Sequence, residues 1–147
     1  MGTAELRLCA GRRHRPDLRM SLSHPEMNDL TERIIGAAIS VHREVGPGLL
    51  ESNYEEAFGI ELRELGIAFA SQPFVPVIYK GHQLSVFFRP DLIVDQQVVV
   101  EIKSVEKLAP IHRSQLLTYL KHTKLKVGLL FNFNSDLLKN GMLRISL

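Results

Sequence analysis

The chain has one cysteine, and it lacks the long apolar segments that mark transmembrane helices and signal peptides. The single cysteine, Cys9, cannot form an internal disulfide, which favours a cytoplasmic location because disulfide scaffolds belong to oxidising compartments. No run of about 18 apolar residues occurs, so we expect no transmembrane helix and no membrane association. The first 20 residues also lack an apolar stretch of signal-peptide length.

The motifs of several enzyme classes are missing as well. The sequence has no P-loop, no GxGxxG fingerprint, no HExxH helix and no paired CxxC, the motifs of common nucleotide and zinc sites. No recognisable elbow carries a nucleophilic serine or cysteine. Covalent serine or cysteine hydrolase chemistry is therefore not expected.

Length and charge predict one domain with a basic tail. A chain of 147 residues with 45% apolar and 23% charged residues is ordinary for one globular domain. The net charge of +2 is uneven, because residues 1–25 sum to +3 and leave −1 for the rest. We expect residues 1–27 to be a disordered basic tail, or a leader before a start at Met20 or Met27, and residues 28–147 to form the domain. Any nucleic-acid contact in the domain must then come from local patches.

Apolar residues recur at helical spacing from Asn28 to Val45, where Asp29 or Thr31 could cap the start and Gly46-Pro47-Gly48 ends the helix. A second helix is expected from Glu51 to Leu65, closed by Gly66, and a third from Pro110 to His122.

β-Branched and aromatic residues predict the strands, which are expected at Phe74–Tyr79, Leu84–Val94, Val98–Ser104, Lys126–Phe133 and Met142–Leu147. A helix between the strands at 98–104 and 126–133 favours a parallel crossover. The fold class is therefore α/β, with a mixed β-sheet flanked by α-helices in a single domain.

Two acidic residues and a lysine stand in one of the most apolar parts of the chain. With a three-residue loop at 95–97, Val94 pairs with Val98 and Asp91 lies opposite Glu101, whereas a two-residue loop would turn Glu101 to the other face. Glu101 and Lys103 are two residues apart and point the same way in either register.

Two carboxylates about 4 Å apart repel by roughly 4 kcal/mol at an effective dielectric of 20. A divalent cation such as Mg²⁺ or Mn²⁺ would reverse that repulsion. The alternative is an exposed hairpin in which Glu101 pairs with Arg89 or Lys103.

Pro90-Asp91 followed by Glu101-Ile102-Lys103 resembles the signature of the PD-(D/E)XK nuclease superfamily. Upstream, the segment from Gly48 through Glu51 to Tyr54 is similar to the motif of the GxxExxY family, a branch of that superfamily. The resemblance extends over about Leu30 to Ser146, and it implies a restriction-endonuclease-like fold.

The resemblance also implies roles for individual residues. Asp91 and Glu101 would be metal ligands for Mg²⁺ or Mn²⁺, and Lys103 would position or activate the attacking water. Glu51 would be a further carboxylate near the metal, or else a first-turn glutamate favoured by the helix dipole. Tyr54 shares the face of Glu51 and either joins the site or packs in the core.

Gln115 and Tyr119 lie four apart on the third helix and resemble a QxxxY motif that holds the substrate backbone, with a polar helix stripe as the alternative. His112 could join them. Positive charge useful for phosphates surrounds this helix, carried by Lys107, Arg113, Lys121, Lys124 and Lys126. The function expected from all this is metal-dependent hydrolysis of nucleic acid, DNA rather than RNA. The rival is a non-catalytic nucleic-acid-binding or protein-interaction module that keeps the fold.

Overall fold

A computed structural model describes residues 21–147 of the chain. Its elements follow the order α2 (His24–Val45), α3 (Glu51–Glu64), β1 (Phe69–Ser71), β2 (Val75–Tyr79), β3 (His82–Phe88), β4 (Leu92–Val94), β5 (Val98–Lys103), α4 (Pro110–Thr123), β6 (Val127–Asn132), the 3₁₀ helix η2 (Leu138–Gly141) and β7 (Met142–Ser146).

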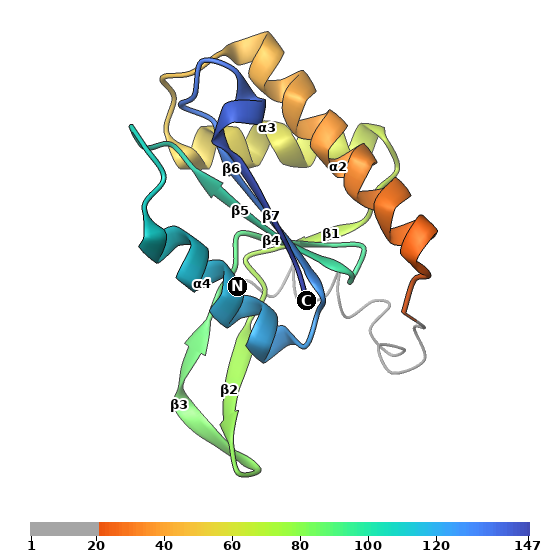
Figure 1. The fold of residues 1–147 in the computed structure, drawn as a ribbon, viewed down its shortest axis with the longest axis vertical. Coiled ribbons are helices and arrows are strands. Elements are labelled where there is room, and N and C mark those ends of the chain that lie inside the picture. Colours follow the sequence, from red (N-terminus) through yellow and green to blue (C-terminus); the bar gives the residue numbers. More distant parts are fainter. Residues whose placement is uncertain (1–20) are drawn as a thin grey trace.

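The main sheet has five strands in the order β1-β4-β5-β6-β7. Strands β5 and β6 are parallel and every other neighbouring pair in that sheet is antiparallel. The parallel pair is joined through α4, as the helix between the two predicted strands indicated. Figure 1 shows α2 and α3 together on one side of the sheet, α4 on the other, and the β2–β3 hairpin projecting away from the body. The expected mixed sheet flanked by helices is confirmed.

The first helix starts earlier than its apolar spacing predicts. It begins at His24, and Ser23 rather than Asp29 or Thr31 caps it, because the Ser23 hydroxyl accepts the Glu26 N–H at 3.4 Å. Residues 24–27 therefore belong to the helix and not to the expected tail, and Met27 packs against the core. Residues 21–23 precede the helix, and residues 1–20 of the expected tail lie outside the described residues.

The strand expected from Leu84 to Val94 is wrong as a single element. It divides into β3, which pairs only with β2, and the short β4 in the main sheet. Pro90 stands at the break and has no N–H to donate to a ladder. Strand β1, which the sequence did not predict, covers the outer edge of β4 by pairing Ala70 with Ile93.

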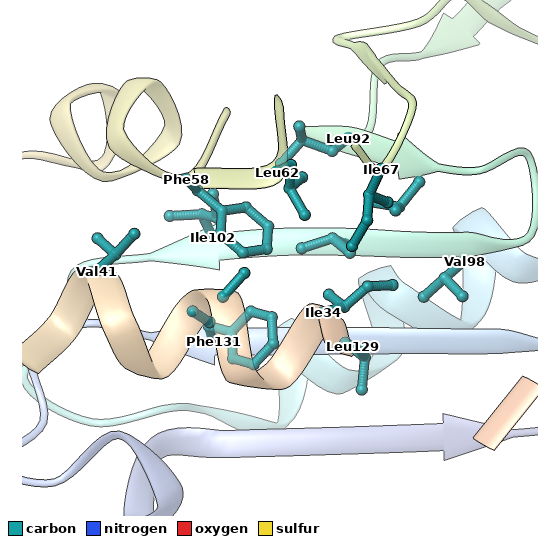
Figure 2. Close-up of a cluster of buried hydrophobic side chains, with 14 of the residues drawn as sticks. Ile34, Val41, Phe58, Leu62, Ile67, Leu92, Val98, Ile102, Leu129 and Phe131 are labelled. Atoms are coloured by element: carbon teal, nitrogen blue, oxygen red, sulfur yellow. The ribbon is translucent and has the colours of Figure 1, made fainter. Parts of the chain in front are cut away.

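The core lies in two parts, one on each face of the main sheet. The larger part fills the space between α2, α3 and the sheet, as the side chains in Figure 2 show. Its largest fully buried members include Phe58, Phe131 and Ile102. The smaller part, under α4, holds Leu116 and Leu120. Alternate residues of β5 and β6 enter the two parts, as the period of a strand requires.

Helix α2 is tied to β7 by one side chain. The Arg144 guanidinium donates to the Thr31 hydroxyl at 3.2 Å and to the Asn28 side-chain oxygen at 3.1 Å. Thr31 is fully buried, and its hydroxyl donates to the Asn28 backbone oxygen. The first described helix and the edge strand β7 are therefore joined by hydrogen bonds.

Candidate active site

The site is built where the β4–β5 pairing ends. Val94 pairs with Val98 and Leu92 with Val100, so the three-residue loop is confirmed and the next position along brings Asp91 beside Glu101. Each carboxylate accepts a hydrogen bond from a backbone N–H of the opposite strand. The Asp91 N–H donates to Glu101 Oε2 at 2.8 Å, and the Ile102 N–H donates to Asp91 Oδ2 at 2.7 Å. These two bonds hold both carboxylates in place at the end of the ladder.

A tight turn supports this register. Asp95 and Gln96 both have positive φ, 51° and 58°, and the Gln97 N–H closes the turn on the Val94 oxygen at 2.9 Å. The Asp95 N–H also donates to the Ala68 oxygen at 2.7 Å. Because the turn is fastened to the chain beside β1, the alternative two-residue loop, which would separate Asp91 from Glu101, does not occur.

Burial and mutual repulsion dominate the charge state of the pair. Glu101 is only 4% exposed, and burial, followed by the charge of Asp91, raises its pKa to about 8. Burial also raises the pKa of Asp91, while the Ile102 N–H and the charge of Lys103 act in the opposite direction. In the metal-free protein the pair therefore retains a proton more readily than two ordinary carboxyl groups do.

The three residues of the predicted signature share one face of the sheet. Glu101 and Lys103 alternate with Val100 and Ile102, which enter the larger core, so both point towards α4. The Lys103 ammonium donates to Gln115 Oε1 across a long 3.4 Å and lowers the pKa of both carboxyl groups. The alternative of an exposed hairpin with a cross-strand ion pair does not hold, because Glu101 is buried and its carboxylate accepts a backbone hydrogen bond.

Helix α4 brings Gln115 and Tyr119 to this face. Tyr119 is 7% exposed, and its ring packs edge-on to Phe88 with centroids 5.5 Å apart. Burial, then the charges of Glu101 and Asp91, raise the pKa of Tyr119 to about 12, so its hydroxyl stays protonated beside the carboxylates. His112 does not join them, since its Nδ1 accepts the Ala109 N–H at 2.9 Å and caps α4.

Glu51, at the start of α3, faces the same region from the other side. Its carboxylate accepts the Ser104 N–H at 3.2 Å, immediately after Lys103, and its charge raises the pKa of Asp91 and Glu101. The Ser104 hydroxyl donates to the Leu49 oxygen at 2.7 Å. Glu51 thus holds the end of β5 against the loop that precedes α3.

Tyr54 packs in the core rather than reaching the carboxylates. It is fully buried, and its ring stacks on Phe133 with centroids 4.6 Å apart. Its hydroxyl donates to the Gly46 oxygen at 2.6 Å and accepts the Leu49 N–H at 3.1 Å. Gly48, between them, has φ of 108°, a backbone that an L side chain rarely adopts. Tyr54 therefore fixes the loop from which Glu51 emerges.

Glu55 is a member of the cluster that the sequence reading missed. It lies one turn after Glu51 on α3, and burial, then the charge of Asp91, raises its pKa. The Ser71 hydroxyl of β1 donates to its carboxylate at 3.0 Å. Its four-residue spacing from Glu51 is visible in the sequence and places the two glutamates on one face of the helix. The contact with Ser71 could not be expected, because the short strand β1 was not predicted.

The carboxylate oxygens of the cluster are suitable ligands for a hard divalent cation, but their present spacing does not form a complete site. Within residues 21–147, no three histidine, cysteine or acidic side chains converge closely enough to hold a metal ion. The expected set of Glu51, Asp91 and Glu101 is thus not assembled as a ready three-ligand site. Asp91 and Glu101 each use one oxygen for the backbone, and the second takes no hydrogen bond from the described chain. Oxygen donors of this kind, in a cluster with Lys103 as the neighbouring cation, fit Mg²⁺ or Mn²⁺.

Comparison with known proteins gives one family. Residues 28–145 match the family model described as PD-(D/E)XK nuclease superfamily. No curated protein and no solved structure matches the chain. Across residues 21–147, no helix has the length and apolar character needed to cross a membrane. The chain belongs to the PD-(D/E)XK nuclease superfamily, and its mixed sheet flanked by helices agrees with a restriction-endonuclease-like fold.

Proposed function

We propose that this member of the superfamily is a metal-dependent nuclease that hydrolyses phosphodiester bonds, with Asp91, Glu101 and Lys103 as its catalytic residues. The observation that carries the proposal is the reciprocal bonding of Asp91 and Glu101 to each other's strands, with Lys103 on the same face. Burying two repelling carboxylates costs stability, and the proposed catalysis supplies a reason to retain them.

Asp91 and Glu101 would hold Mg²⁺ or Mn²⁺, with Glu51 as a further ligand. The bound ion would supply Lewis-acid polarisation of the phosphoryl oxygen and a water of lowered pKa. Glu101 would have to lose its proton to serve as a ligand, because its pKa lies near 8 without the ion. Lys103 would offset the negative charge that grows on the phosphoryl group during attack.

Gln115 and Tyr119 would position the substrate and the lysine. Gln115 already accepts a hydrogen bond from Lys103, and the protonated Tyr119 hydroxyl lies near both carboxylates. The basic residues around α4 would attract the phosphates, since Lys107, Arg113 and Lys121 are all exposed. We include DNA rather than RNA as substrate and a cytoplasmic location in this proposal.

We include membership of the GxxExxY family in the same proposal. Its three motif residues would together fix the loop that precedes α3. Gly48 allows the turn, Tyr54 fastens it through Gly46 and Leu49, and Glu51 holds the end of β5 at Ser104. The motif would thus position the Glu51 carboxylate at the site.

One observation favours the non-catalytic rival, namely that no three potential ligands converge in the described chain. A cleavage assay decides between them: purified protein with Mg²⁺ or Mn²⁺ on single- and double-stranded DNA and RNA. We expect cleavage by the wild type and by Asp136→Asn, an exposed aspartate that is not among the charges acting on the pKa of Asp91 or Glu101, and none by Asp91→Asn. Equal activity of Asp91→Asn and the wild type would disprove the assigned site.

A further inference from the structure

The β2–β3 hairpin exposes more large apolar side chains than any other part of residues 21–147. It projects from the body (Figure 1), and most of β3 faces solvent. Its exposed apolar residues are Phe74, Ile78, Tyr79, Leu84, Val86 and Phe87. So many exposed apolar side chains on one short hairpin indicate an interaction site.

The charge of the hairpin indicates what kind of partner it meets. Residues 72–90 contain Lys80, Arg89 and His82 and no acidic residue, whereas residues 21–71 and 91–147 together carry 14 acidic residues against 11 lysines and arginines. The neighbouring segment 103–126 has six lysines and arginines and only Glu106 as an acid. The charge of the hairpin and that of the segment around α4 are thus both suited to a polyanion, while the charge of α2 and α3 is not.

Cations and aromatic rings are interleaved on the hairpin. At its base, the rings of Phe74 and Phe87 lie 4.9 Å apart and the Arg89 guanidinium lies 5.4 Å from the Phe87 centroid. At its tip, the Lys80 ammonium lies 5.5 Å from the Tyr79 ring. Rings that accept a stacked base, next to cations that accept a phosphate, are the combination that binds single strands.

The hairpin is held in a fixed relation to the candidate active site. Phe88 packs on Tyr119 and on His122 of α4, with centroids 5.5 Å and 5.3 Å apart. Strand β3 then leads through Arg89 and Pro90 directly to Asp91. A strand bound along the hairpin would therefore be led towards the carboxylates.

We propose that the β2–β3 hairpin binds an unpaired nucleic-acid strand and delivers it to the site. Bases stack on Phe87 and Phe74 and at the tip on Tyr79, while Arg89 and Lys80 contact phosphates. Bases in a duplex are already stacked on each other, so the rings reach only unpaired bases. The inference rests on the proposed nuclease function and names its substrate as single strands or duplexes with a single-stranded end.

Binding is measured in EDTA by fluorescence anisotropy, so that it does not depend on cleavage. The probes are labelled oligodeoxythymidine, oligouridine and a blunt duplex. The variants are Phe87→Leu, which keeps apolar bulk without a ring, and Phe87→Trp, which keeps a ring. The control is Ile60→Ala, because Ile60 is 49% exposed on α3 and Phe87 is 47% exposed. Circular dichroism melts check that each variant folds.

We expect Phe87→Leu to weaken single-strand binding by about 5- to 150-fold, Phe87→Trp and Ile60→Ala to bind as the wild type does, and the blunt duplex to bind less tightly than single strands. Unchanged binding by a folded Phe87→Leu, equal binding of the blunt duplex, or no binding by the wild type would overturn the proposal. A wild-type dimer that Phe87→Leu converts to monomer without loss of binding would also overturn it, since the hairpin would then join two copies. Binding without cleavage in Mg²⁺ or Mn²⁺ would leave this inference standing and remove the proposed hydrolysis instead.

Discussion

The two faces of the main sheet do different work, although the same strands form both. The face under α2 and α3 is packed with apolar side chains from end to end. The face under α4 has a smaller apolar cluster and then Glu101, Lys103 and Tyr119. Within β5, residues that alternate along the strand divide between the two, so Ile102 lies in the larger core between Glu101 and Lys103.

The charges of the helices follow the same division. Residues 24–64, which contain α2 and α3, have nine acidic residues and three arginines, whereas residues 103–126 around α4 have six basic residues and one acidic residue. A polyanionic substrate is therefore attracted to the face that holds the catalytic candidates and repelled by the one that supplies most of the core.

Substitutions in β6 measure how much the core on each face of the sheet contributes to the free energy of unfolding. Phe131→Ala should lower the free energy of unfolding by about 3–5 kcal/mol, because it leaves a cavity in the larger core. Leu130→Ala, its neighbour on the α4 face, should cost less because its cluster is smaller. Urea denaturation followed by circular dichroism gives both values, and equal losses would contradict the division.

Lys103→Ala tests whether chemistry depends on the α4 face. We expect the cleavage rate to fall by roughly 10²–10³, or about 2.7–4 kcal/mol, by analogy with a lost oxyanion donor. Metal affinity should be unchanged or slightly higher, since a protonated lysine repels a cation, whereas Glu101→Ala should lose both activity and metal binding. Calorimetric metal titration and cleavage rates separate these effects, with the exposed Lys139→Ala, outside the basic residues around α4, as the control. Wild-type cleavage by Lys103→Ala would remove that lysine from the mechanism.

Metal addition should stabilise the domain through the candidate active site. A cation that binds only the folded state at a hundredfold excess over Kd adds about 2.7 kcal/mol. Glu101→Gln should lose this gain, while Glu106→Gln, exposed in the loop after β5, should keep it. Thermal melts with and without Mg²⁺ or Mn²⁺ make the comparison, and an unchanged wild-type midpoint in both metals would favour the non-catalytic rival.

The metal-free protein should become less stable as pH rises, owing to Glu101. Burial and the charge of Asp91 raise its folded-state pKa from the ordinary value of 4.5 to about 8, so the folded protein keeps a proton that the unfolded chain releases. The stabilisation is complete below pH 4.5 and is lost as pH rises to about 8, by up to roughly 1.4 kcal/mol per pH unit. Urea unfolding in EDTA across that pH range should show that the free energy of unfolding depends less on pH in Glu101→Gln than in the wild type. A variant profile as steep as the wild type would assign the slope to other groups.

The site was predicted best where short-range rules decide the geometry. An odd loop length and the two-residue period of strands were enough to bring Asp91, Glu101 and Lys103 onto one face. The early start of α2 was also readable, because Ser23 with Glu26 three residues on is a capping pattern and Pro25 suits the first turn.

Long-range contacts account for what was missed. Glu55 enters the cluster only because β1, a strand of three residues and too short to show a period, brings Ser71 against it. The division of Leu84–Val94 depends on β3 leaving the sheet with β2, which local propensity does not reveal, although Pro90 gave a warning. The assignment of Tyr54 to core or site likewise required knowing that Phe133 lies beneath it.

The bonds from Arg144 to Thr31 and Asn28 have a consequence for biosynthesis. Among the described elements, the helix that leaves the ribosome first is fastened by a side chain of the strand that leaves last. Contacts so distant along the chain form late and slow the folding of a domain. Until β7 emerges, Arg144 cannot make these hydrogen bonds, and α2 is held by its packing against α3 and the larger core.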